Sequence, residues 1–209
     1  NGKTEGTESD PLIWYQSVDN SITPHDSYPV FDSDRGIIYT TTQCGNESKI
    51  TGYSNKVGYT TDHPGTFNNG FCTKCKKYYQ KPSGSGTNNS PYQISNGGQL
   101  YWFACVVNGI EEDLVKCQNS PSKNAAAYGN LTADINLANG NGETTTVEIN
   151  GSNVTCGVWT PIGDKDLYSS DYSGTFNGNS HTVSNWAVQD KTYSGLFGSA
   201  GIIKNVNVD

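Results

Sequence analysis

A repeat of about twenty residues near the C-terminal end constrains the fold of this chain more than any other feature. The sequence YSGTF at residues 172–176 returns as YSGLF at residues 193–197, an offset of 21 residues. Residues 182–188 align with residues 202–208 at an offset of 20, with apolar side chains at alternating positions. A period this short cannot accommodate a pair of helices, but it fits one coil of a β-solenoid. The repeat therefore predicts stacked coils of β-strands.

Stacked coils also predict which side chains meet. The expected pairs are Phe176 with Phe197, Val188 with Val208, and Asn185 with Asn205. The phenylalanine and valine pairs would fill a dry interior, while the asparagine amides would bond from coil to coil at a turn.

Residues 96–109 carry the one convincing helix signal in the sequence. Asn96 can cap the helix, and Gln99, three residues later, can reach back to complete a capping box. Apolar residues follow at helical spacing, at Leu100, Phe103, Ala104 and Val107. The helix should end near Asn108 and Gly109. We expect a short amphipathic helix that covers the first coil, whose apolar interior would otherwise be exposed.

Several runs in the second half of the chain resemble, in order and wording, the GLUG-repeat family of bacterial proteins. They are QLYWFA at residues 99–104, LTADINL at 131–137, WTPIG at 159–163, YSGTFNG at 172–178, HTV at 181–183 and GLFG at 195–198. The resemblance covers residues 92–209. It implies a right-handed parallel β-helix of large extracellular proteins, among them adhesins and stalks of immunoglobulin A peptidases. It implies no catalytic residues within the repeat.

The chain departs from the family pattern in two insertions, at residues 111–123 and 138–157, each of which contains a cysteine. We expect both to be loops that project from the solenoid and carry partner specificity, since repeat proteins place such insertions on a binding face.

The N-terminal part also resembles segments of such proteins. Residues 1–43 contain short apolar runs that resemble the segment that closes a β-helix. Residues 44–81 form a Cys-rich module, and residues 82–91 are predicted to be a flexible linker before the capped β-helix of residues 92–209. The predicted fold class is mainly β: a right-handed parallel β-helix, N-capped by one short α-helix and preceded by a small Cys-rich β module.

In this chain, a segment that resembles the closing end of a β-helix precedes the start of a β-helix. This order suggests a subunit whose N-terminal segment closes the β-helix of a neighbouring copy. Residues 11–40 of one copy would cover the open coil of another, and such a head-to-tail contact does not close on itself, so it generates a filament. Use of the open end in this way would also explain how an aggregation-prone edge is tolerated.

Charge and hydropathy exclude some partners. The chain has 13 Lys and Arg against 20 Asp and Glu, and its net charge of −7 repels nucleic acid. No run of about 20 apolar residues is present, so we expect no membrane insertion in this segment.

Four residues in the Cys-rich module have the chemistry of a metal site. Cys72 and Cys75 have the spacing of a zinc knuckle, and Cys44 and His63 can complete a tetrahedral set for structural Zn²⁺. A framework of disulfides in an oxidising compartment is the alternative.

If zinc takes three cysteines, then Cys105, Cys117 and Cys156 remain, an odd number that leaves one thiol over. A disulfide of Cys117 with either Cys105 or Cys156 is compatible with the sequence, which does not choose between them.

The sequence indicates no enzyme. A redox Cys-x-x-Cys requires the start of a helix, which the residues around Cys72 do not predict. His181 is expected to be structural, and the acidic clusters 111–113 and 164–166 to be solvated. We therefore expect a cell-surface or extracellular bacterial protein that acts in adhesion or as a self-assembling fibre, with itself or a surface glycan or protein as partner. The alternative is a non-catalytic stalk or carbohydrate-binding part of a larger secreted protease or glycan-active enzyme.

Overall fold

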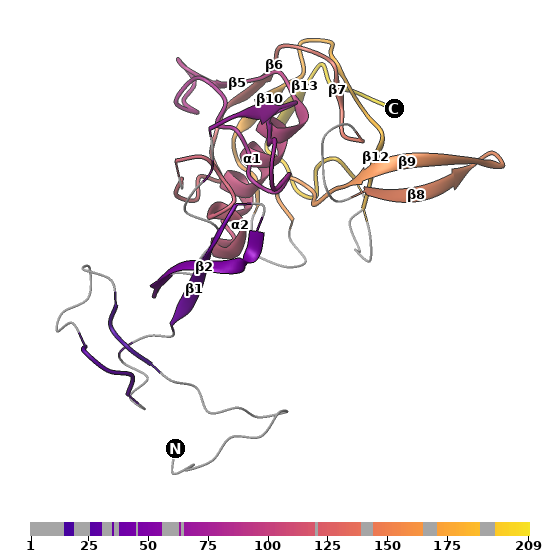
Figure 1. The fold of residues 1–209 in the computed structure, drawn as a ribbon. Helices are drawn as coiled ribbons and strands as arrows, with labels where there is room; N and C mark the ends of the chain where they lie inside the picture. Colours follow the sequence, from indigo (N-terminus) through magenta and orange to yellow (C-terminus); the bar gives the residue numbers. More distant parts are fainter. Residues whose placement is uncertain are drawn as a thin grey trace. The chain divides into compact units, whose positions relative to one another are not determined.

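The computed structural model describes most of the second half of the chain and parts of the first. The described residues are 15–18, 26–30, 35, 38–44, 46–55, 63, 65–119, 121–138, 144–164, 171–188 and 195–209. They belong to two compact units, Asn1–His63 and Pro64–Asp209. The described elements are mainly β-strands (Figure 1), as the sequence predicted.

The first unit contains an antiparallel hairpin of β1 (Tyr39–Gln43) and β2 (Asn46–Ser54), whose register shifts near its tip. In a separate contact, Tyr15 and Val30 form an antiparallel bridge with two backbone hydrogen bonds of 2.8 and 2.7 Å. Most of residues 11–34 lie outside the described residues, so the resemblance of this segment to a β-helix terminator stays a prediction.

Helix α1 (Gly97–Asn108) begins and ends where the sequence predicted. The Asn96 side chain accepts a hydrogen bond from the Gln99 backbone N–H at 3.0 Å, and Gln99 Oε1 accepts from the Ser95 N–H at 2.9 Å. Gly109 closes the helix in the left-handed conformation, with φ of 71°. Of the two described helices, neither has the length and apolar character of a membrane span.

The expectation of an amphipathic helix is wrong, because every residue of α1 is buried. Phe103 packs against the ring of Phe176, with centroids 5.5 Å apart. Tyr101, on the opposite side of the helix, packs against Phe71 at 5.6 Å and Trp159 at 5.1 Å. The helix thus lies inside the core, between the coil strands and residues 67–79, which form the short hairpin and turn that follow Pro64.

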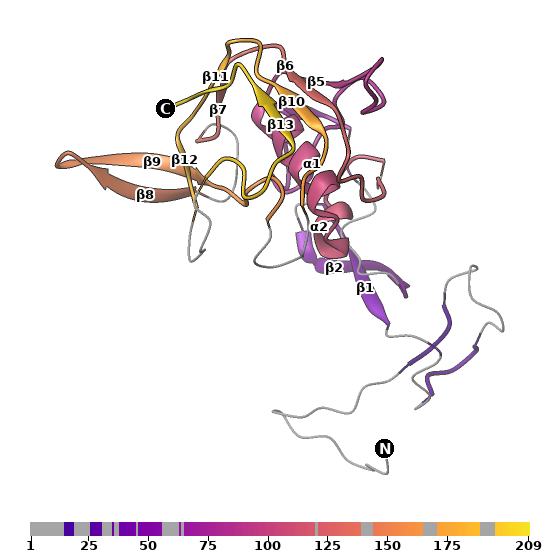
Figure 2. The same cartoon turned by 180° about the vertical axis from the view of Figure 1, so that it is seen from behind.

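Parallel strands form three sheets in the second unit. The first sheet has the order β13 (Ile202–Lys204), β10 (Thr175–Asn177), β6 (Gly129–Leu131) and β5 (Tyr92–Ile94), which lie side by side in Figure 2. The second has β14 (Asn207–Val208), β11 (Thr182–Ser184) and β7 (Ile135–Asn136). In the third, β12 (Trp186–Ala187) pairs in parallel with β9 (Ser152–Val158).

The strands recur in the same sheet order with each pass of the chain. One pass supplies β6, β7 and β9, the next supplies β10, β11 and β12, and β13 and β14 begin another. The parallel pairing predicted from the repeat is therefore confirmed, and the strands described within residues 172–188 and 195–208 form no antiparallel hairpin.

The predicted register of the coils is partly wrong. Phe176 and Phe197 do meet, with ring centroids 5.2 Å apart. The strand partner of Phe176 is Ile203, however, and Val208 pairs with Val183 rather than Val188. These pairs are 27 and 25 residues apart, not 20. In parallel pairing, a residue that points inward lies next to another that points inward. Phe and Ile can both occupy such a position, so sequence identity was a poor guide to register.

The predicted Asn185–Asn205 pair is replaced by another polar contact. Asn205 donates from its side chain to Asn177 Oδ1 at 3.4 Å, and its carbonyl accepts from the Ser180 N–H at 2.8 Å. Asparagines at the turns therefore do form hydrogen bonds between successive passes of the chain. The partner of Asn205, however, is the turn after β10 and not the turn after β11.

Only one of the two insertions projects. In residues 138–157, β8 (Thr144–Ile149) and β9 form an antiparallel hairpin that extends away from the strands of the second unit in Figure 1. Residues 111–123 instead form the short helix α2 (Glu111–Leu114) and a segment packed into the core, where Cys117 is fully buried. The expectation that this first insertion projects is wrong, because its backbone pairs with Tyr79 on both sides of Cys117.

Residues 82–91, expected to be a linker, make ordered contacts within the second unit. Ser85 N–H donates to Ser90 O at 2.9 Å, and Tyr128 N–H donates to Gly86 O at 2.9 Å. The boundary between the two units lies between His63 and Pro64, whereas the sequence suggested one within residues 82–91.

Close packing of Gly98 on Gly70 yields a stability prediction. A Cβ at Gly98 would lie 1.9 Å from Gly70 O, a backbone atom, whereas a Cβ at Gly97 would lie 3.1 Å from the edge of the Phe71 ring. Gly98→Ala should lower the free energy of unfolding by about 2 kcal/mol, although alanine favours helix. Urea unfolding of Gly97→Ala, expected within about 1 kcal/mol of wild type, is the matched control. Equal stability of the two variants would contradict this packing.

Candidate metal centre

A tight hairpin positions Cys72. Strands β3 (Phe67–Asn68) and β4 (Phe71–Cys72) are antiparallel and are joined by Asn69 and Gly70, whose φ angles are 48° and 77°. Asn-Gly is the pair that a type I′ hairpin turn favours. A Cβ at Gly70 would also lie 1.9 Å from the Asn96 side-chain oxygen, so glycine is required there twice over.

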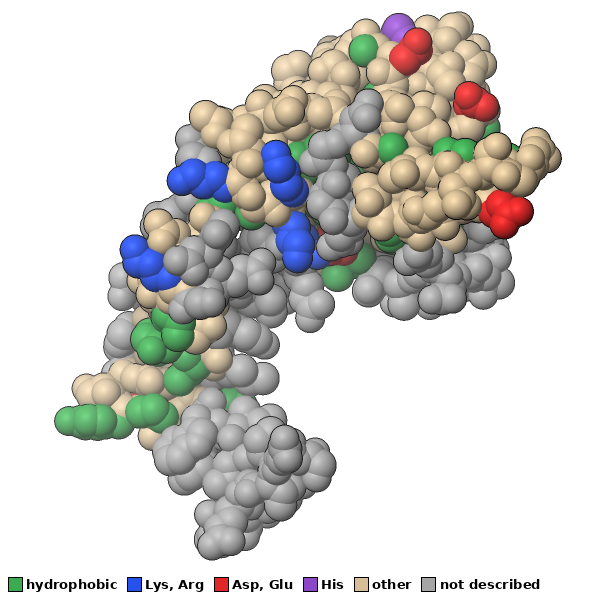
Figure 3. Space-filling model, turned by 45° about the vertical axis from the view of Figure 1, so that its right-hand side comes forward, with side chains coloured by type: hydrophobic (Ala, Val, Ile, Leu, Met, Phe, Trp, Pro, Cys, Tyr) green, Lys and Arg blue, Asp and Glu red, His purple; other side chains and the backbone are tan. Residues whose placement is uncertain are grey.

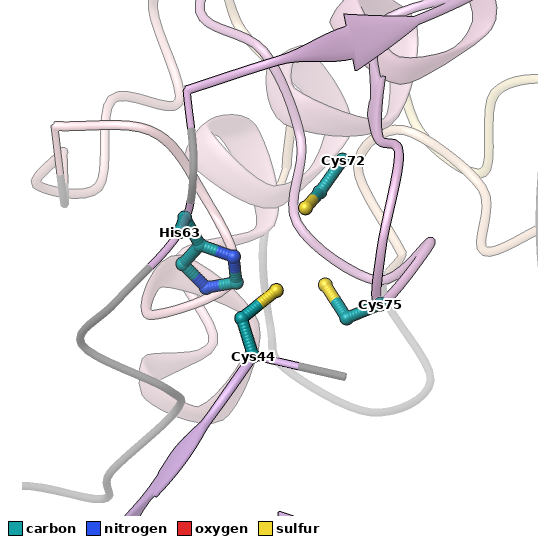
Figure 4. A group of neighbouring side chains, drawn as sticks. All are labelled: Cys44, His63, Cys72 and Cys75. Atoms are coloured by element: carbon teal, nitrogen blue, oxygen red, sulfur yellow. The ribbon is translucent and has the colours of Figure 1, made fainter. Parts of the chain in front are cut away.

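A second turn places Cys75 beside Cys72. The Lys76 N–H donates to Cys72 O at 3.0 Å, and Lys76 has a φ of 59°. The Cys72 N–H donates to Tyr78 O at 2.9 Å. The chain is thus folded back around Cys72, and both sulfurs point into the same space in Figure 4.

Cys44 and His63 supply the remaining potential ligands. Cys44 is buried and follows β1 in the turn of the β1–β2 hairpin, and His63 is half-buried. Figure 4 shows the four labelled side chains directed toward one another. The three sulfurs and one imidazole nitrogen all lie within 4.8 Å of one another.

This donor set fits zinc. Tetrahedral Zn²⁺ with bonds of about 2.3 Å to sulfur and 2.0 Å to nitrogen holds its ligand atoms about 3.5–3.8 Å apart. The observed separations require only a small contraction. Disulfides fit less well, because three cysteines cannot all pair with one another, and the imidazole would have no role.

Basic residues and one tyrosine lie next to the two-cysteine turn. Lys74 stands between Cys72 and Cys75 in the sequence, and Lys76 and Lys77 follow. The pKa of the Tyr78 phenol is raised, chiefly by its burial and to a lesser extent by the charges of neighbouring cysteines, Cys72 and Cys75 among them. No pattern in the sequence indicated that Tyr78 lies this close to the thiols.

His181, which the sequence also singled out, does not belong to the group of three cysteines and one histidine. His181 Nδ1 is 3.2 Å from Asp134 Oδ1, and the Thr182 N–H donates to the same oxygen at 2.9 Å. The Thr182 bond, followed by that of His181, lowers the pKa of Asp134. This pair joins successive coils, in keeping with the structural role expected of His181.

Of the acidic clusters, the structure describes the side chains of Asp113 and Asp164. Asp113 forms an ion pair with Lys116 at 2.8 Å and is partly exposed. Asp164, expected to be solvated, is only 1% exposed, and its N–H donates to the Asn108 side chain at 3.3 Å. Asn108 also accepts from the Gly163 N–H at 2.8 Å and so fixes this corner of the coil in the core.

Comparisons with protein-family models, curated proteins and solved structures find nothing that matches this chain. The resemblance to the GLUG-repeat family therefore stays a prediction from the quoted motifs, and the argument for function depends on the structure itself.

Proposed function

We propose that the chain is a non-enzymatic scaffold of the bacterial cell surface or extracellular space, in which a right-handed β-helix of the GLUG-repeat type joins copies end to end. The parallel strands that return to the same sheets in the same order support a β-helix. The observation that carries the assembly is an edge of exposed apolar side chains on β13 and β14.

Columns of apolar side chains run from the core to this edge. Phe176 and Val183 are fully buried, while their outer partners Ile203 and Val208 are 43% and 58% exposed. β13 and β14 are the outermost strands of their sheets. An outermost strand offers backbone N–H and C=O groups to a further strand, and exposed apolar side chains favour its addition.

The occupant proposed for this edge is residues 11–40 of a second copy. This segment resembles a β-helix terminator and contains the apolar run at residues 12–15. Because donor and acceptor are different surfaces of the same chain, each added copy exposes a new acceptor, and the product is a filament.

The Cys44, His63, Cys72 and Cys75 group has a structural role in this proposal. A catalytic zinc keeps one position for water or substrate, whereas here protein side chains can supply all four ligands. Figure 3 shows both basic and acidic side chains among the described residues of one face. The net charge of −7 disfavours nucleic acid as a partner.

Electron microscopy and sedimentation of the zinc-loaded protein test the assembly. Wild type should form filaments, and Ile203→Lys should abolish them by placing a charge at the acceptor edge. Ile149→Lys is the matched control, because Ile149 is 49% exposed on β8, the outer strand of another sheet. This control should assemble like wild type.

A mixing experiment identifies the donor. Trp14→Lys should block the donor segment and Ile203→Lys the acceptor, so each variant alone stays monomeric while their mixture forms dimers and no longer species. A wild type that remains a monodisperse monomer at high concentration would refute assembly. Binding of that monomer to a glycan array would then favour the carbohydrate-binding alternative, for which the exposed rings of Tyr28 and Tyr53 are candidates.

A further inference from the structure

Two buried cysteines outside the metal group lie near each other in the core. Cys105 is in the last turn of α1 and is 8% exposed, and Cys117 follows α2 and is fully buried. The Cys117 thiol donates to Asp113 O at 3.5 Å, and Asp113 lines the same cavity as Cys105. Both belong to the central hydrophobic cluster, whereas Cys156, on β9, is not among the described residues of that cluster.

The backbone on both sides of the pair is held in place. Cys105 O accepts the capping hydrogen bond from Gly109 at 2.8 Å. On the other side, the Trp102 indole donates to Gln118 O at 3.0 Å, and the Gln118 N–H donates to Tyr79 O at 2.9 Å. The two thiols are thus brought together by the fold rather than by chance contact of loose loops.

Space for the approach of the sulfurs exists beside Cys105. A cavity of about 80 Å³ is lined by Cys105, Asp113 and Lys116, among others. A disulfide requires its sulfurs to approach to about 2.05 Å. The cavity leaves room beside Cys105 for such an approach.

We propose that Cys105 and Cys117 form a structural disulfide that ties the end of α1 to the segment after α2. The bond would form by exchange with a low-molecular-weight disulfide. One cysteine thiolate attacks that disulfide and releases one thiolate, and the second cysteine then attacks the mixed disulfide and releases the other. Two protein thiols lose two electrons and two protons, and the external disulfide is reduced to two thiols.

The timing of the bond follows from its burial. Burial, followed by the neighbouring Cys105 side chain, raises the pKa of the Cys117 thiol, so the folded reduced protein holds little of the thiolate that exchange requires. The disulfide should therefore form while the chain folds. It uses none of the proposed metal ligands, and it leaves Cys156 as the single remaining thiol.

The sequence makes the pairing easy to map. Lys116 separates Cys105 from Cys117, and Lys123 separates Cys117 from Cys156, so each of these cysteines lies in its own tryptic peptide. The reduced, denatured wild type is refolded with zinc and oxidised glutathione, alkylated with N-ethylmaleimide and digested with trypsin. Peptides 78–116 and 117–123 should be recovered as one disulfide-linked species, with Cys156 alkylated.

Variants and a stability readout separate this bond from the metal. Removal of the disulfide by reductant should lower the melting temperature by roughly 6–12 °C in wild type and in Cys156→Ser, and should have no such effect in Cys117→Ser. Zinc is quantified in each sample, so that loss of metal is distinguished from loss of the disulfide.

Two results would overturn the proposal. One is a linked peptide that joins Cys117 to Cys156. The other is complete alkylation of Cys105 and Cys117 in wild type that has refolded oxidatively and retains zinc. The mapping uses wild type, so it gives an answer even if a cysteine variant fails to fold.

Discussion

Replacing Cys72 with serine is expected to abolish zinc binding by the chain. Cys72 is almost fully buried and supplies one of four donor atoms that lie within 4.8 Å of one another. Structural zinc contributes about 10–16 kcal/mol in small zinc domains, so loss of one of four ligands should cost about 3 kcal/mol or more. The apparent affinity should therefore fall about 100-fold or more.

Cobalt substitution gives the most direct measurement. Wild type titrated with Co²⁺ should show the absorption of tetrahedral cobalt bound to thiolates, and one equivalent of Zn²⁺ should displace it. Cys72→Ser should lose this signal, while Cys156→Ser, which alters a buried cysteine outside the group, should keep it. Lower pH should release the metal from wild type, because protons compete for the thiolates.

Equal metal binding by Cys72→Ser and Cys156→Ser would contradict a site at these residues. A wild type that binds no zinc, and in which tryptic peptides of Cys44, Cys72 or Cys75 are linked, would support the disulfide framework instead.

Truncation of Phe176 should cause the largest loss of stability among the coil residues. Its side chain is fully buried and contacts the rings of Phe103 at 5.5 Å and Phe197 at 5.2 Å. Phe176→Ala should lower the free energy of unfolding by about 3–5 kcal/mol, because it removes these contacts and leaves a cavity. Urea unfolding with zinc present measures the effect.

Two substitutions serve as controls for Phe176. Phe176→Leu keeps most of the volume and should cost about 1.5 kcal/mol or less. Ile203→Ala alters the next position outward, which is 43% exposed, and should cost about 1 kcal/mol or less. A cost for Phe176→Ala as small as that for Ile203→Ala would mean that the column of stacked side chains is not the core of the coils.

Local signals in the sequence were sufficient to predict where helix α1 begins and ends. Asn96, Gln99 and Gly109 act within one turn of the chain, so their roles could be predicted without knowledge of the rest of the fold. The burial of α1 could not be predicted in this way. It depends on Phe71 and Trp159, which lie far away in sequence and pack on the side of Tyr101 that periodicity assigned to solvent.

The parallel pairing of the strands could also be predicted, but not its register. The recurrence of an aromatic five-residue motif indicated stacking correctly, yet the strands that pair are Phe176 with Ile203 and Val183 with Val208. Turns of unequal length between the strands change the number of residues in each pass. A short motif does not indicate that number, so it cannot predict the register.

The Cys-x-x-Cys spacing identified half of the candidate metal group, because a short turn fixes the geometry of Cys72 and Cys75 locally. Cys44 and His63 were inferred from residue type, and the structure brings their ligand atoms to the same place. The choice between Cys105 and Cys156 as the neighbour of Cys117 required the structure, since it depends on how residues 111–119 pack against α1.

The position of α1 in the chain also determines the order in which this unit can fold. The helix is enclosed on all sides, so it has little stability until residues that flank it along the chain have docked. The hairpin containing Cys72 leaves the ribosome before the helix, whereas β6, β10 and β13 leave afterwards, one after another. We therefore expect folding to proceed in one direction, from a nucleus of this hairpin and helix, with every later strand templated by the one synthesised before it.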